Sequence, residues 1–136
     1  MTPPKVLQAD PTGSAAAALS AHPIETLRKR RDFLAANHGL RQVTPGFLVQ
    51  ARKRKPDECD PEAIRVGYTC SKKVGNAVTR NRAKRRLREI ARLVVPKHGR
   101  SGWDYVLIGR AGATVYLAFD NLSADLGAAL GRIHKR

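Results

Sequence analysis

The chain has 136 residues, with 26 Lys or Arg against 11 Asp or Glu, and its formal net charge is +15 at pH 7. This length suits one domain with a modest core, and the charge predicts a polyanionic partner, either nucleic acid or an anionic membrane surface. No apolar run approaches the ~18 residues of a membrane-spanning helix, and the basic segment lacks the broad apolar face of a helix that lies in lipid. We therefore expect a nucleic-acid partner, no membrane partner and a cytoplasmic location.

The first 23 residues differ in composition from the rest of the chain. They are rich in Pro and Ala, with an alanine run at 15–18, and their only cation is Lys5. The apolar piece is too short, and one lysine too weak an n-region, for a secretory signal. We predict a disordered N-terminal extension over 1–23 and a single domain over 24–136.

Residues 24–37 have the pattern of a short helix closed by Gly39. Leu27 and Phe33 are among its apolar members, and the run 28–31 forms its cationic side. On the residues alone, a phenylalanine in such a helix is more often part of the core than a platform on which bases stack.

Two strands are predicted next. The run 47–51, which is apolar except for Gln50, follows a Thr-Pro-Gly turn and is typical of a strand. From Ile64 to Ser71 apolar and polar residues alternate, which predicts a strand with one face against the core. Gly67 would weaken this strand unless another group must approach closely there, or unless the chain bulges.

A long helix with one apolar stripe is predicted after the Gly75-Asn76 turn. Its apolar residues recur at the helical period, at positions 83, 87, 90, 91 and 94. Asn76 or Thr79 could cap its N-terminus, and Pro96 with Gly99 would end it.

Cations cover most of the remaining circumference of this helix. Between Arg65 and Arg100 there are twelve Lys or Arg and one acid, Glu89. An ordinary solvated face mixes both signs, so a polyanion lying against the helix is the better interpretation. Lys72 and Lys73 precede the positive N-terminal end of the helix and its free amides, which favours an anion site there.

The C-terminal third predicts one more strand and one more helix. Residues 105–108 form a continuous apolar run, as in a strand covered on both faces, and Trp103 would pack at its entrance. Residues 119–133 carry apolar side chains at helical spacing. The segment 115–117 is ambiguous between loop and short strand.

The sequence contains no pattern typical of a catalytic centre. No Ser/His/Asp set, paired carboxylates or phosphate-binding loop is visible, and the acids are scattered or gathered in the turn 57–62. Cys59 and Cys70 have no metal-ligand spacing with the four histidines. We expect reduced, inert thiols, no catalytic residue, no metal ligand and no cofactor bound by the protein itself.

The basic stretch closely resembles one family. Ser-Lys-Lys-Val-Gly-Asn-Ala-Val at 71–78, Arg-Asn-Arg at 80–82 and Lys-Arg at 84–85 resemble the signature of the bacterial ribonuclease P protein subunit, and the similarity extends over about 25–133. The resemblance implies an α+β fold with a small four-stranded sheet packed with helices, in the order α-β-β-β-α-β-α. It also implies a left-handed β-α-β crossover, although nearly all such crossovers are right-handed.

The same resemblance implies a function in removing the 5′ leader of precursor tRNA, with chemistry carried by a partner RNA and by Mg²⁺ bound mainly to that RNA. The cleft between the first helix and the sheet would hold the leader, around Phe33, Gln50 and Gly67. Family members often have aromatic residues where this chain has Asn37 and Gln50. The catalytic RNA and the phosphates near the cleavage point would be bound by Lys72, Lys73, Asn76, Arg80, Asn81, Arg82, Lys84, Arg85, Arg86 and Arg88.

Three alternatives stay open at this point. A ribosomal-protein-like binder of structured RNA, without a role in cleavage, would explain the charge but not the ordered signature. A helix-turn-helix DNA-binding module fits less well, because the basic helix follows a strand and not a helix with a short turn. A stand-alone protein nuclease would need a catalytic set that the sequence does not display.

Overall fold

The computed structural model describes residues 24–55 and 62–135. The predicted extension over 1–23 lies outside the described residues. The elements follow one another as β1 (Ile24–Thr26), α3 (Arg30–Ala36), β2 (Leu40–Val43), β3 (Phe47–Lys53), β4 (Ile64–Thr69), the 3₁₀ turn η1 (Lys72–Val74), α4 (Ala77–His98), β5 (Trp103–Gly109), α5 (Ala113–Tyr116) and α6 (Phe119–Lys135).

The strands form one mixed sheet in the order β1-β4-β5-β3-β2. Strands β1, β4 and β5 are parallel neighbours, whereas β3 runs antiparallel to both β5 and β2. The α+β class is confirmed, but the prediction of four strands is wrong because the sheet has five. The two edge strands are only three and four residues long, too short to show a clear alternation in the sequence.

One further helix boundary differs from the sequence prediction, and another agrees with it in part. The first helix begins at Arg30 and not near residue 24, because residues 24–26 pair with β4. Helix α4 ends at His98 with Gly99 as its C-cap, as predicted, but Pro96 lies within the helix and does not end it. The Gly99 N–H donates to the Val95 carbonyl. Proline removes one backbone donor, but it does not end this helix, which stays packed on the sheet.

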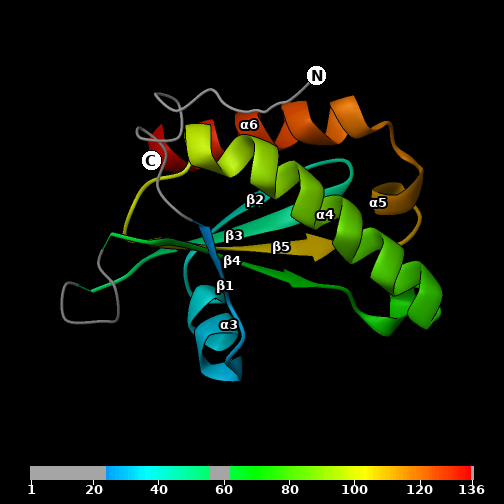
Figure 1. Cartoon of the computed structure of the whole chain (residues 1–136), viewed down its shortest axis with the longest axis horizontal. Coiled ribbons are helices and arrows are strands. Elements are labelled where there is room, and N and C mark those ends of the chain that lie inside the picture. Colours follow the sequence, from blue (N-terminus) through cyan, green and yellow to red (C-terminus); the bar gives the residue numbers. More distant parts are fainter. Residues whose placement is uncertain (1–23, 56–61, 136) are drawn as a thin grey trace, which may run out of the picture.

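Helices cover the sheet unequally (Figure 1). Helices α4 and α6 lie side by side on one face, where their apolar stripes pack against β3, β4 and β5. Leu87, Ile90, Leu126 and Leu130 are fully buried in this layer. Within residues 24–55 and 62–135, the opposite face is covered only by the seven-residue helix α3, through a small cluster that includes Leu27, Phe33 and Val106. Much of that second face is therefore available to form a site.

Helix α4 connects the parallel neighbours β4 and β5. Consider the sheet of Figure 1 seen from the side that α4 covers, with strands β4 and β5 both pointing upward. In that view β5 lies to the left of β4. The crossover is therefore left-handed, as the family resemblance implies and against the general rule. Within residues 24–55 and 62–135, no helix is long and apolar enough to cross a membrane.

Candidate nucleic-acid interface

Three small or polar residues, Ser71, Gly75 and Asn76, shape the turn before α4. The Ser71 hydroxyl accepts a hydrogen bond from the Lys73 N–H at 3.2 Å, and the Asn76 carboxamide oxygen caps α4 by accepting one from the Thr79 N–H at 2.9 Å. Between them, Gly75 has a φ of 148°, a backbone conformation that residues other than glycine rarely adopt. The turn holds Lys72 and Lys73, both exposed, next to the beginning of the helix.

Asn76, predicted to contact RNA, therefore also has a structural function in the fold. Its side-chain oxygen satisfies a helix amide, which the sequence analysis anticipated as one of two possible caps. The neighbouring Asn81 is exposed on the first turns of α4.

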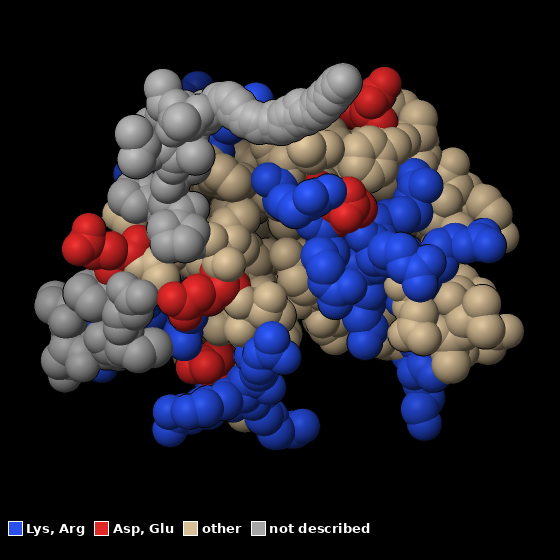
Figure 2. Space-filling model, viewed as in Figure 1, with Lys and Arg blue, Asp and Glu red and all other residues tan. Residues whose placement is uncertain are grey.

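Cations gather in two places on the surface, one over α4 and one over α3, with a hollow between them (Figure 2). On α4, Arg80, Lys84 and Arg88 recur every fourth residue along the edge of the helix that adjoins β4. Arg82 and Arg85 are exposed on the side of the helix away from its buried stripe. The predicted basic surface is thus present for these five residues.

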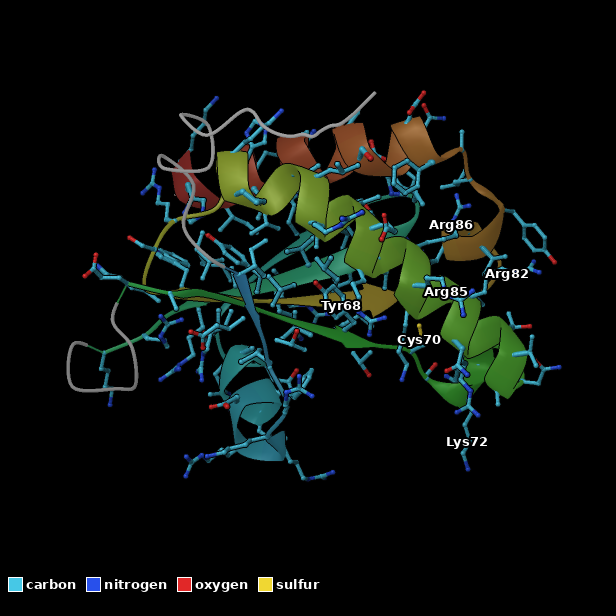
Figure 3. All side chains as sticks on the ribbon, viewed as in Figure 1. Tyr68, Cys70, Lys72, Arg82, Arg85 and Arg86 are labelled. Atoms are coloured by element: carbon cyan, nitrogen blue, oxygen red, sulfur yellow. The ribbon has the colours of Figure 1, made fainter. Side chains whose placement is uncertain are left out.

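Arg86 lies differently from its neighbours. Its Nε donates a hydrogen bond to the Thr114 carbonyl at 3.0 Å, and its Nη2 donates another to the Leu117 carbonyl. Figure 3 shows Arg86 directed from α4 toward α5, whereas Lys72 extends away from the fold. The expectation that Arg86 projects from the helix with the other cations is wrong, because its guanidinium ties α4 to the α5 segment.

A groove of about 410 Å³ runs between α3 and the sheet. It brings Phe33 and Gln50 together, as predicted, although they come from different elements. We call it the leader groove below, because the family resemblance implies that the 5′ leader lies in this cleft. Its lining residues are Arg28, Arg30, Phe33, Asn37, Gln50, Tyr68, Thr69, Val106 and Ile108.

Gly67 has a different surrounding from the one expected. It is buried beneath the Phe33 ring, where an added Cβ would lie 2.6 Å from Phe33 Cε1 and 3.1 Å from the Leu27 Cβ. The close approach that the sequence indicated at this glycine is made by the chain's own aromatic ring. Gly67 thus positions Phe33 from below and does not itself line the groove.

The floor of the leader groove is polar at one point. Gln50 is only 5% exposed, and its Nε2 donates a hydrogen bond to the Asn37 Oδ1 at 2.8 Å. Asn37 lies one helical turn after Phe33, so the amide pair stands beside the ring. These two residues occupy the positions where the resemblance implies frequent aromatic side chains, and they bond to one another.

Tyr68 is the groove residue that the sequence analysis missed as a functional candidate. Tyr68 is among the residues that line the leader groove, and its ring packs with the apolar layer on the α4 side of the sheet, where the Arg88 guanidinium carbon lies 5.3 Å from the ring centroid. This cation–π contact joins the groove to the basic edge of α4. Burial raises the pKa of the Tyr68 phenol, and the Arg88 charge opposes that effect. Its position in the sequence could have indicated this role, because Tyr68 is an aromatic residue only three positions before Ser71, where the signature begins.

The described residues supply no cluster suited to a metal. Among residues 24–55 and 62–135, no three His, Cys, Asp or Glu side chains come together in a way that could hold a metal ion. Burial raises the pKa of the Cys70 thiol, opposed by a Gly109 backbone hydrogen bond and by Lys84 and Arg80. Cys59 lies outside the described residues.

Comparisons with known proteins identify the family of this chain. A family model described as Ribonuclease P matches residues 22–134. The chain belongs to the ribonuclease P protein family. It is 61% identical over 111 residues to the ribonuclease P protein component of Ruegeria pomeroyi, covering 82% of this chain and 87% of that protein. The protein component of Paramagnetospirillum magneticum is 44% identical over 111 residues, covering 81% and 83%.

A solved structure supports the fold. The ribonuclease P protein from Thermotoga maritima superposes with a TM-score of 0.65 and 32% identity, covering 80% of this chain and 97% of that one. Membership of the ribonuclease P protein family makes this chain an RNA-binding component with a part in tRNA processing.

Proposed function

We propose that this chain is the protein subunit of ribonuclease P and assists a catalytic RNA in the endonucleolytic removal of the 5′ leader from precursor tRNA. The observation that carries the proposal is the continuity between the leader groove and the basic edge of α4. Tyr68 belongs to both, because it lines the groove and lies under Arg88.

Each part of this surface suits a different part of the substrate. Single-stranded RNA is commonly held by stacking on aromatic side chains together with cations along its backbone. Phe33 supplies a ring within the groove, and Arg28 and Arg30 supply cations beside it. Along α4, Arg80, Lys84 and Arg88 are spaced one turn apart, a spacing suited to phosphates of the catalytic RNA and of the precursor near the cleavage point.

The protein's contribution to catalysis is then positioning and charge neutralisation. We propose that the partner RNA carries out the hydrolysis and holds most of the Mg²⁺ that supports it. The groove would keep the leader extended away from the mature tRNA, while Arg82, Arg85 and the other exposed cations of α4 would lower the repulsion between two polyanions.

The test compares binding of precursor tRNA and mature tRNA to the complex of protein and catalytic RNA. Phe33→Ala should weaken precursor binding by about tenfold, because one stacked base is lost. Mature tRNA lacks the leader, so its affinity should stay nearly unchanged. Phe33→Tyr, which keeps the ring, should retain most of the preference for the precursor.

Leu34→Ala is the matched control for this experiment. Leu34 is the next residue of α3 and is 47% exposed, and it is not among the residues that line the leader groove. Circular dichroism establishes that each variant is folded. The protein without the catalytic RNA should leave the precursor uncut.

Equal losses for precursor and mature tRNA in folded Phe33→Ala would contradict the leader assignment. If wild-type protein binds the catalytic RNA but gives no preference for the precursor and no effect on cleavage, the ribosomal-protein-like alternative would replace the proposal.

A further inference from the structure

A second hollow, of about 510 Å³, lies on the other side of α3 from the leader groove. Adjacent residues of α3 face different hollows: Arg30 lines the leader groove, whereas Arg31 lines the second hollow. On β4 the Phe33 ring over Gly67 separates them, with Arg65 on one side and Thr69 on the other. Four strand residues span ~13 Å, so the two hollows lie close together.

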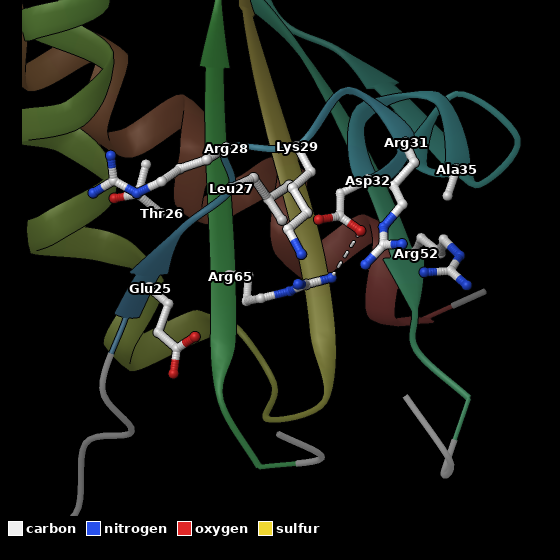
Figure 4. A pocket seen from close by; sticks show the side chains of 10 residues that line it. All are labelled: Glu25, Thr26, Leu27, Arg28, Lys29, Arg31, Asp32, Ala35, Arg52 and Arg65. Atoms are coloured by element: carbon white, nitrogen blue, oxygen red, sulfur yellow. Dashed lines mark ion pairs between the residues drawn. The ribbon is translucent and has the colours of Figure 1, made fainter. Parts of the chain in front are cut away.

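The second hollow is strongly cationic, and we call it the arginine pocket. Its lining includes five cations and two carboxylates, which belong to Glu25 and Asp32. Figure 4 shows the side chains of Lys29, Arg31 and Arg65 directed toward Asp32, while Glu25 points elsewhere. The ion pair between Asp32 and Arg65 is 3.5 Å long. Among the residues that line the pocket, Asp32 is thus the one carboxylate toward which these cations are directed, and its single charge is smaller than the sum of theirs.

A buried ion cluster fixes the wall of the arginine pocket. Asp104 is fully buried and accepts hydrogen bonds from Arg65 Nε at 2.8 Å and Arg65 Nη2 at 2.7 Å, as well as from Arg54 Nη1 at 2.6 Å. Arg52 lies 3.8 Å from the same carboxylate. Asp104 thus holds the Arg65 guanidinium in place in the wall of the pocket. The cations that the pocket presents to solvent are Arg28, Lys29 and Arg31, which are exposed.

This arrangement suits an anion that offers several oxygens at once. Guanidinium groups held in fixed orientations bind phosphate well, since they need little reorganisation to form charge-assisted hydrogen bonds. Arg28 lines both the leader groove and the arginine pocket, so a strand that leaves the groove past the beginning of α3 meets a cation on its way to the pocket.

We propose that the arginine pocket binds backbone phosphates of the precursor's 5′ leader, beyond the nucleotides that the leader groove holds. The proposal rests on the proposed function, because it assumes that the groove receives the leader. It adds a second contact for the leader on the far side of α3. Phosphate recognition there depends on charge and not on base identity, so it should favour long leaders of any sequence.

The experiment uses precursor tRNAs whose leaders grow one nucleotide at a time, bound to the complex of full-length protein and catalytic RNA. For the wild-type protein, affinity should rise first as the groove fills and again when the leader reaches the pocket. Arg31→Ala should remove the second rise, lowering the affinity of long-leader precursors by about fivefold, the size of one exposed ionic contact. Short-leader precursors should bind as before.

Arg30→Ala and Arg132→Ala are the matched controls. Arg30 is the adjacent cation on α3 but lines the leader groove, so its loss should weaken short and long leaders alike. Arg132 is an exposed cation on α6, across the sheet, and its loss should change neither. For long leaders only, Arg31→Ala should also flatten the slope of log K against log salt by roughly 0.7, the value for one single-strand phosphate.

The outcomes separate the pocket from the groove. If the wild-type protein favours precursors over mature tRNA but gains nothing from longer leaders, the arginine pocket does not bind the leader and the proposed function stands. If Arg31→Ala weakens mature tRNA and every precursor equally, the pocket contacts the catalytic RNA or the tRNA body, and the proposal is wrong. If no precursor preference exists in the wild type, the proposed function itself fails.

Discussion

The two faces of the sheet are built on different physical principles. The face under α4 and α6 is apolar: Phe47, Val49, Tyr105 and Leu107 are fully buried there among the apolar side chains of two long helices. On the other face, alternate residues of the same strands are Gln50, Arg65 and Asp104, and the short α3 is the helix that covers them in the part of the chain that the structure describes.

This difference assigns stability mainly to one face and binding mainly to the other. Burial of apolar area is the dominant favourable term in folding, and the α4–α6 layer supplies most of it here. The opposite face can therefore keep polar groups, hollows and exposed cations. A domain of this size has little core to spare, so the two tasks are separated by the plane of the sheet.

The largest expected effect concerns Asp104, a buried acid on the binding face. Asp104→Asn keeps the size of the side chain but leaves Arg54 and Arg65 without their shared carboxylate. Removing one partner from a buried ion pair costs about 3–5 kcal/mol, so the free energy of unfolding should fall by that amount. Chemical denaturation measures it.

Leu126→Ala provides the comparison on the apolar face. It should cost about 2–5 kcal/mol by leaving a cavity. The folded variant should retain the dependence of affinity on leader length, whereas Asp104→Asn should lose it together with the geometry of the arginine pocket. If Asp104→Asn leaves stability unchanged, the buried cluster does not support the binding face as described.

A smaller effect distinguishes two adjacent arginines of α4. Arg86→Ala leaves the Thr114 and Leu117 carbonyls without their donor and should cost about 1–3 kcal/mol of stability. Arg85 is exposed, so Arg85→Ala should change stability by less than about 0.5 kcal/mol. It should instead weaken binding of the catalytic RNA and flatten the salt slope by roughly 0.7 to 0.9. Thermal unfolding measures the stability of the two variants, and RNA titration at several salt concentrations measures their affinity. A stability loss in Arg85→Ala, with Arg86→Ala affecting only RNA binding, would contradict the structure.

The smallest effect is a pH dependence at the rim of the apolar face. The His134 Nε2 lies 2.6 Å from the Tyr105 hydroxyl, and its ring packs edge-on against Trp103. Burial, with the nearby Arg100 charge, lowers the pKa of His134. The folded state therefore binds this proton less readily than the unfolded state does. The stability that neutral His134 gives to the folded state is fully present above the unfolded pKa of about 6.5. It is lost as the pH falls from there toward the lower pKa of the folded state.

His134→Gln tests this by comparison. The variant keeps a polar group near Tyr105 but removes the titration, so its melting temperature should fall less than that of the wild type as the pH is lowered through this range. Identical pH profiles for the two proteins would show that His134 does not contribute.

Local pattern alone predicted the long elements of this protein and its polyanion-binding character. The stripe that includes Ala83, Leu87 and Ile90 predicted the buried face of α4, because a helix repeats its contacts every three to four residues whatever it packs against. Strands β3, β4 and β5 and helix α6 were found in the same way, and the ordered signature indicated the family. The edge strands β1 and β2 were missed, since strands this short exist only through the neighbours that pair with them.

The details of the site were decided by residues far apart in the chain. Phe33 covers Gly67, Arg65 meets Asp104, and Arg86 reaches Thr114 only after the crossover has brought their elements together. Charge and side-chain type say which residues can bind an anion, but not which of them already have a partner within the fold. The sequence therefore determined that α4 is basic, and the tertiary structure determined that Arg86 ties α4 to the α5 segment while Arg82 and Arg85 are exposed. The reason is that a hydrogen bond depends on distance in space, which local periodicity does not report.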